Sequence, residues 1–163
     1  MSANAVTVHR SLASGLSRQG IPQRATFERW VVATLAGVRR RRPTELSIRI
    51  VGDDEGRALN MQYRERDYAT NVLSFPADLP PALKLPLIGD LVICATVIAD
   101  EAQVQGKRLH DHYAHMTVHG VLHLLGHDHQ ADEDAERMEA LEARILAGLG
   151  ITDPYASADA TRP

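Results

Sequence analysis

Seven of the chain's eight histidines lie between His110 and His129, and their spacing is suited to binding a metal ion. In a helix, His119 and His123 would lie on one face, one turn apart, where two imidazoles can bind one ion at roughly 2.0–2.1 Å. Gly126 can adopt a left-handed conformation at little steric cost, so it is suited to end that helix and let His129 turn back as a third ligand. Three neutral imidazoles leave one tetrahedral position for water, so the segment predicts a catalytic metal site.

An alternative interpretation is that these histidines are half-buried side chains with ordinary hydrogen bonds. Several imidazoles buried together without a metal would need several separate partners, which argues against this alternative. Zn(II) is the default ion for three histidines, although Ni(II), Co(II) and Mn(II) fit the same ligands. His127 could be a solvated neighbour of the ligands, and His112 is interpreted as incidental. The apolar residues around the cluster are Val118, Val121, Leu122, Leu124 and Leu125.

The residue after the first histidine separates two known families. In metzincin proteases it is a glutamate that acts as the general base, whereas here it is Gly120. The segment instead resembles the YbeY family of bacterial metal-dependent endoribonucleases, whose pattern is His-Gly-x-x-His-x-x-Gly-x-Asp-His. His127 stands where that family usually has an aromatic residue. Further matching stretches lie at residues 59–60, 63–64, 67, 70–76 and 89–94, so the resemblance covers residues 45–147.

This resemblance implies roles for residues outside the histidine pair. Arg64 matches the family's active-site arginine, although by itself it would be interpreted as a surface arginine on an amphipathic helix. Such an arginine can clamp a phosphate oxygen and offset the charge that develops in the transition state. His115 matches a position that is often histidine in the family, and with Asp128 it is expected to support the ligands without binding the ion. Asp128 could equally form the local turn. Asp100 or Glu101 could act as a general base, but solvated helix positions are favoured for both.

A run of four arginines, Arg39, Arg40, Arg41 and Arg42, precedes Pro43. A solvated helix end is the favoured interpretation, because cations suit a helix C-terminus and proline prevents continuation. The functional alternative is contact with RNA phosphates, whose oxygens arginine can bind bidentately.

Composition limits the classes of protein that the chain can represent. A chain of 163 residues is most simply one domain, and it is large enough to bury about two thirds of its unfolded surface. The net charge of −3 provides no global basic field for nucleic acid, so RNA would have to bind to a local patch. The single cysteine, Cys94, excludes an internal disulfide, and its apolar neighbours predict a buried thiol. We see no export signal in residues 1–10 and no apolar run of membrane-spanning length, so we expect a cytoplasmic protein with no membrane association.

Periodicity predicts helices and strands in loose alternation, which indicates an α+β domain over residues 1–150. Residues 151–163 are expected to form a disordered tail. The YbeY resemblance implies a mixed, roughly four-stranded sheet packed with helices around a central metal-binding helix, in a zincin-like arrangement. The expected strands are residues 5–9, 46–51, 72–75 and 89–94, the expected helices are residues 23–38, 53–67, 95–105, 110–125 and 132–149, and a loop is expected at 78–86.

The function implied by the family is cleavage of single-stranded RNA in maturation of the 16S rRNA 3′ end and in ribosome quality control. The metal would activate a water molecule, Arg64 would bind the phosphate, and the missing side chain of Gly120 would leave room for the RNA strand. Precursor rRNA, the small ribosomal subunit and its assembly factors are the expected partners. A metalloprotease, or a non-catalytic assembly factor with a structural metal, is the alternative.

Overall fold

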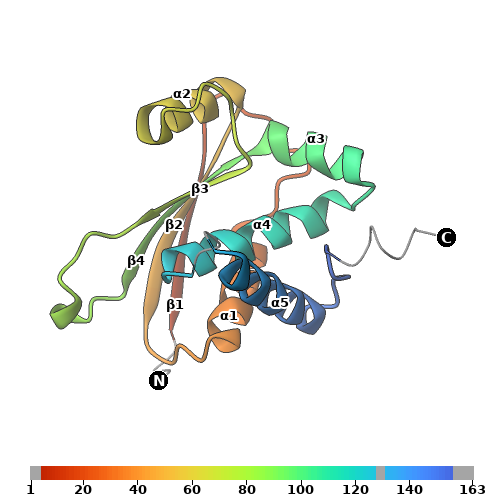
Figure 1. Ribbon diagram of the computed structural model, residues 1–163. Helices are drawn as coiled ribbons and strands as arrows, with labels where there is room; N and C mark the ends of the chain where they lie inside the picture. The colour runs from red at the N-terminus through yellow and green to blue at the C-terminus, as the bar shows by residue number, and fades with distance from the viewer. Residues whose placement is uncertain (1–4, 128–130, 156–163) are drawn as a thin grey trace.

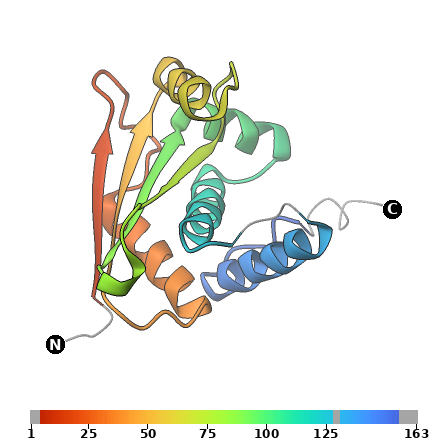
Figure 2. The same ribbon diagram turned by 60° about the vertical axis from the view of Figure 1, so that its left-hand side comes forward.

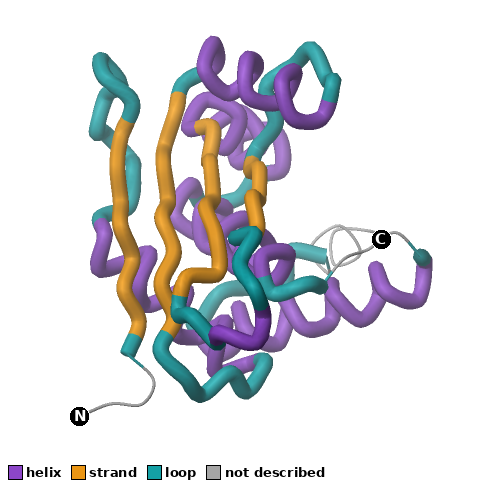
Figure 3. Tube along the Cα trace, turned by 90° about the vertical axis from the view of Figure 1, so that its left-hand side faces the viewer, coloured by secondary structure: helices purple, strands orange, loops and turns teal. Residues whose placement is uncertain are grey.

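Four strands form the sheet of the computed structural model, which describes residues 5–127 and 131–155 (Figure 1). Their order across the sheet is β1-β2-β4-β3. Strands β1, β2 and β4 run parallel, whereas β3 pairs antiparallel with β4 at the sheet edge (Figure 3). The expected α+β class with a mixed four-stranded sheet is therefore confirmed. The strands are β1 (Val6–Leu12), β2 (Thr44–Val51), β3 (Val72–Pro76) and β4 (Leu87–Cys94).

The described residues form five α-helices, three of which lie on the same side of the sheet. Helices α1, α4 and α5 form this group, and α4 lies between the sheet and α5 (Figure 2). Helix α2 packs on the opposite face, where Val51, Leu73, Val92 and Cys94 form a second apolar cluster. The buried Cys94 agrees with the prediction of a buried thiol. The helices are α1 (Arg24–Gly37), α2 (Asp53–Arg64), α3 (Ala95–Gln105), α4 (Leu109–Leu124) and α5 (Asp132–Gly148).

Alternation along β2 explains which face of the sheet the helices cover. Leu46, Ile48 and Ile50 are fully buried in the main core. Because successive side chains of a strand point to opposite faces, Ser47 and Arg49 point away from that core and are only partly buried. One face of the sheet thus packs against the helical layer that carries the histidines.

Gly120 faces the sheet, which corrects the expectation that it leaves room for an RNA strand. A Cβ atom at this position would lie 2.8 Å from Leu91 Cδ2 and 3.2 Å from Val72 Cγ2. The absence of a side chain therefore allows the backbone of α4 to approach strands β3 and β4. Ser74 Oγ, from β3, also donates a hydrogen bond to the Gly120 carbonyl at 3.2 Å.

The arginine run follows helix α1 instead of forming its last turn. The helix ends at Gly37, and Arg39 adopts a left-handed conformation with φ of 58°. The backbone N–H of Arg40 then donates to the Leu35 carbonyl at 2.9 Å, a bond that satisfies an end carbonyl of the helix. The run therefore belongs to the connection between α1 and β2.

Residues 151–155 pack onto the domain, which corrects the expectation of a disordered tail from residue 151. Ile151 is buried, and the Tyr155 hydroxyl donates to the buried carboxylate of Glu142. These contacts hold the segment against α5 and α4. The rest of the expected tail, residues 156–163, lies outside the described residues. Within the described ranges, no helix is long and apolar enough to cross a membrane.

The close approach at Gly120 predicts a loss of stability when a methyl group is added. Gly120→Ala is expected to lower the free energy of unfolding by about 1–2 kcal/mol, because overpacking outweighs the roughly 1 kcal/mol that alanine gains in a helix. Gly148→Ala is a matched control, since a Cβ at this other helical glycine would meet nothing within 4 Å. Urea denaturation measures both variants, and a Gly120→Ala protein as stable as its parent would contradict the packing argument.

Candidate active site

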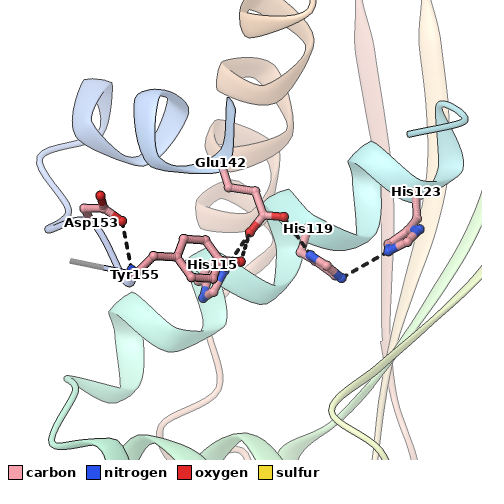
Figure 4. A network of polar contacts seen from close by, with 6 residues as sticks. All are labelled: His115, His119, His123, Glu142, Asp153 and Tyr155. Atoms are coloured by element: carbon pink, nitrogen blue, oxygen red, sulfur yellow. Dashed lines mark hydrogen bonds and ion pairs between the residues drawn. The ribbon is translucent and has the colours of Figure 1, made fainter. Parts of the chain in front are cut away.

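Helix α4 carries His115, His119 and His123 along one stripe that faces α5 and the β3 edge of the sheet. Figure 4 shows His115, His119 and His123 on this stripe, with the Glu142 side chain reaching toward it from α5. The helix ends as predicted from sequence, because Gly126 has a φ of 94° and the His127 N–H donates to the Leu122 carbonyl at 3.0 Å. This left-handed turn stops α4 one residue after His123.

The Glu142 carboxylate is fully buried and accepts hydrogen bonds from three side chains. His115 Nε2 lies 2.8 Å from Glu142 Oε1, and His119 Nδ1 lies 2.7 Å from Oε2. The Tyr155 hydroxyl donates to Oε1 as well. Burial alone would raise the pKa of the Glu142 carboxyl, but these donors outweigh it and lower the pKa to about 2. The carboxylate is therefore ionised at neutral pH.

An ionised Glu142 determines which nitrogen of His119 carries the proton. The carboxylate can only accept, so His119 must donate through Nδ1, and a neutral ring then has its lone pair on Nε2. That Nε2 lies 3.1 Å from Nε2 of His123. Two nitrogens bound to one tetrahedral ion would be about 3.3 Å apart. The pair thus has the chemistry and the spacing of two ligands of one metal ion.

His129 and Asp128 lie outside the described residues, so both remain predictions from the sequence. Within residues 5–127 and 131–155, no group of three histidine, cysteine or carboxylate side chains is arranged to hold a metal ion. His115 is positioned to support His119, because both imidazoles donate to the same Glu142 carboxylate.

A cleft of about 510 Å³ brings Arg64 together with His119 and His123. Arg64 is the last residue of α2, after which Glu65 turns left-handed with φ of 58°. Its guanidinium is exposed and makes no ion pair with any carboxylate of the described residues. The described lining contains no acidic side chain, so the cleft is suited to an anion. Its other lining residues are Tyr63, Thr70, Asn71, Val72, Leu73, Ser74 and Phe75.

An aromatic pair lies in the cleft beside Arg64, and its two residues belong to stretches that match the family but had no role assigned to them. The rings of Tyr63 and Phe75 meet edge to face, with centroids 4.9 Å apart. Tyr63 is 58% exposed although it packs on Phe75, so its ring is available to a ligand. Aromatic faces of this kind stack with nucleic-acid bases.

His112, interpreted as incidental from sequence, belongs to a second histidine–carboxylate pair. Its ring is buried, and its Nε2 lies 2.8 Å from Glu101 Oε1. Burial lowers the pKa of His112 despite the nearby carboxylate, so the ring is neutral at pH 7 and donates to Glu101. Glu101 also accepts from Asn71, which lines the cleft. Glu101 is thus half-buried and bonded, whereas Asp100 is exposed as expected.

Glu142 is the main site residue that sequence reasoning missed. One signal could have revealed it, because Glu142 follows Met138 by four residues and precedes Ile145 by three. That spacing places a carboxylate on the buried stripe of α5, where an unpaired charge would be costly. The four arginines lie outside the cleft, in the connection between α1 and β2.

Comparison with known proteins identifies the family. A family model described as Endoribonuclease YbeY matches residues 17–150. A Stenotrophomonas maltophilia protein named Endoribonuclease YbeY is 56% identical over 160 residues, covering 96% of this chain and 98% of the relative. A Xylella fastidiosa protein of the same name is 55% identical over 159 residues, covering 95% and 98% of the two chains.

The chain therefore belongs to the YbeY endoribonuclease family, as its motifs predicted, and it is a hydrolase that acts on RNA. This membership decides against the metalloprotease alternative. The fold has a solved counterpart, since the solution structure of TM1509 from Thermotoga maritima matches with a TM-score of 0.55 and 20% identity. The match covers 88% of this chain and 91% of the other.

The hydrogen-bond network of Glu142 with His115, His119 and Tyr155 leads to a prediction for Glu142→Gln. This variant should be less stable, and the His119 proton should no longer be restricted to Nδ1. The amide offers one acceptor oxygen where the carboxylate offers two, so we expect the free energy of unfolding to fall by about 1–3 kcal/mol. Glu136→Gln, an exposed change on the same helix, should stay within about 0.5 kcal/mol of the parent. Denaturant titration measures stability, and nitrogen-15 NMR of the imidazoles reports the tautomer.

If Glu142→Gln kept the parent's stability and the Nδ1–H form of His119, the network would have no positioning role.

Proposed function

We propose that the cleft hydrolyses phosphodiester bonds of single-stranded RNA, with a divalent metal ion held by His119, His123 and His129. The observation that carries this proposal is that Arg64, from α2, and the two described histidines, from α4, line one cleft. A cation without a carboxylate partner in the described chain and a pair of converging imidazoles are the two features that phosphoryl chemistry needs. We also infer that the arrangement around α4 is zincin-like.

The histidines are suited to Zn(II), with Ni(II) as a second candidate. Glu142 holds the proton of His119 on Nδ1, so that Nε2 is left to bind the ion. His115 shares the charge of that carboxylate, and Asp128 is proposed to orient the ligands further. When bound, the ion would supply a Lewis acid for a phosphate oxygen and a lowered pKa for water.

Arg64 would act on the phosphate itself. A guanidinium donates two parallel N–H bonds to nonbridging phosphate oxygens, and it keeps its charge at any physiological pH. Because negative charge on those oxygens increases toward the transition state, these hydrogen bonds strengthen as the reaction proceeds. Arg64 therefore combines substrate positioning with transition-state stabilisation.

The aromatic pair supports a single-stranded substrate. A base can stack on the exposed Tyr63 ring only if it is not already stacked within a duplex. Tyr63 precedes Arg64 in α2, so a nucleotide could place its base on the ring and its phosphate at the guanidinium. Following the family, we propose precursor 16S rRNA near its 3′ end as the physiological substrate. Ribosome quality control, the small subunit and its assembly factors, and a cytoplasmic location belong to the same proposal.

The test of this proposal is cleavage of a labelled single-stranded RNA by the purified protein with Zn(II). Activity should disappear with a chelator and in His123→Ala. Arg64→Gln should lower kcat by about 10²–10³-fold, as expected for loss of a donor to the transition state. Arg66→Gln is the matched control, because Arg66 is exposed in the same segment but does not line the cleft, and it should keep parental activity.

Two results would contradict the proposal. Equal activity in the parent and His123→Ala would indicate a contaminating nuclease. A parent that binds one metal ion per chain but cleaves no RNA would favour the assembly-factor alternative for this chain.

Stacking on the aromatic pair predicts a separate effect on binding. Tyr63→Ala should weaken the affinity for single-stranded RNA by about 5- to 150-fold, since stacking of one base contributes about 1–3 kcal/mol. Tyr68→Ala removes another exposed tyrosine that does not line the cleft, so it should bind like the parent. Fluorescence anisotropy in chelator measures both, and equal losses in the two variants would exclude a stacking role for Tyr63.

A further inference from the structure

A second groove, of about 380 Å³, continues the cleft along the same two walls. Strand β3 contributes residues 72–75 to the cleft and Pro76 to the groove. Helix α4 and its end contribute His119 and His123 to the cleft, and then Leu124, Leu125 and Gly126 to the groove. In both β3 and α4 the lining of the groove begins at the residue that follows the last lining residue of the cleft, and the β3–β4 connection and the start of β4 contribute to the groove as well.

Three cationic side chains line this groove, namely Arg40, Arg42 and Lys84. No acidic side chain of the described residues lines it, and Asp78, in the same β3–β4 connection as Lys84, is not among the lining residues. None of the three cations forms an ion pair within the described part of the chain. The groove is thus a local basic patch on a protein whose net charge is −3.

The two arginines of the groove are held close together. Arg40 Nε donates to Thr44 Oγ1 at 2.7 Å, and Thr44 in turn donates to the Arg42 carbonyl at 3.1 Å. Burial lowers the pKa of Arg40, and the charge of Arg42 lowers it further. Two like charges near each other without a carboxylate are stabilised when an anion binds between them.

We propose that this groove binds the sugar–phosphate backbone of the single-stranded RNA whose cleavage occurs in the adjoining cleft. The strand would follow the seam between β3 and α4, with Arg42, Lys84 and Arg40 contacting phosphates beyond the nucleotide at Arg64. Only half of the arginine run takes part, because Arg39 and Arg41 do not line the groove. The inference rests on the proposed function for the identity of the ligand.

The experiment compares two double variants with the same change in charge. Arg42→Gln/Lys84→Gln removes two groove cations, neither of which makes a side-chain hydrogen bond in the described structure. Arg39→Gln/Arg41→Gln removes two cations from the same connection but outside the groove. Each is titrated, by fluorescence anisotropy in chelator, against one labelled RNA that fills the cleft alone and one long enough to reach the groove. Thermal melting establishes that both variants are folded.

We expect the groove variant to bind the long single strand about tenfold more weakly, and the slope of log affinity against log salt to become shallower by about 1.4. Its affinity for the short RNA should not change, and the Arg39→Gln/Arg41→Gln protein should match the parent with both. Equal losses in the two double variants, or no loss in the groove variant, would overturn the proposal. So would an acidic peptide that binds the groove as tightly as the long RNA.

Binding in chelator separates this inference from the proposed activity. A parent that binds the long RNA through the groove cations but cleaves nothing with metal would refute the nuclease mechanism and leave the groove intact. A parent that cleaves RNA, together with a groove variant that binds RNA normally, would support the nuclease mechanism and refute the groove proposal.

Discussion

The Glu142 carboxylate has no contact with solvent, and the structure around the histidines follows from the need to compensate its charge. An isolated ionised carboxylate in a protein interior is unstable unless donors surround it. Three side chains meet that need, two from α4 and one from the segment after α5. The same hydrogen bonds therefore fix the packing of α5 on α4, the position of Tyr155 and the orientation of the His119 ring.

A second constraint is the close spacing between the backbone of helix α4 and the sheet. Because α4 approaches β3 and β4 at Gly120, His119 and His123 line the cleft next to residues of the edge strand β3. The end of α2 then brings Arg64 to the same edge from the other face of the sheet. The cleft is thus a product of packing between elements far apart in the chain, and Gly120, which allows one of these contacts, takes no part in the chemistry.

Residue spacing in the sequence predicted those features of the site that depend on neighbouring residues. The four-residue spacing of His119 and His123 and the left-handed turn at Gly126 could be read from the sequence, because both depend on a few neighbouring residues. Arg64 could not, since nothing in its helix distinguishes it from a surface arginine, and only the resemblance to the family singled it out. Sequence periodicity does not reveal contacts between elements that are distant in the chain. For this reason it predicted neither the packing of Gly120 on the sheet nor the bond between His112 and Glu101. It also did not predict the packing of residues 151–155 on the domain. Glu142 was missed for the same reason, because its partners lie 23 and 27 residues earlier.

The position of Tyr155 in the chain bears on the order in which the protein matures. During synthesis the chain grows from its N-terminus, and a domain generally folds as one unit. Strands β1, β2 and β4 and the histidine helix can be made before Glu142 exists, and that carboxylate in turn precedes the hydroxyl that completes its hydrogen bonds. The three hydrogen bonds to Glu142 can therefore coexist only after the segment that carries Tyr155 has been synthesised. The order of synthesis thus places the carboxylate that orients His119 after the imidazoles that it orients.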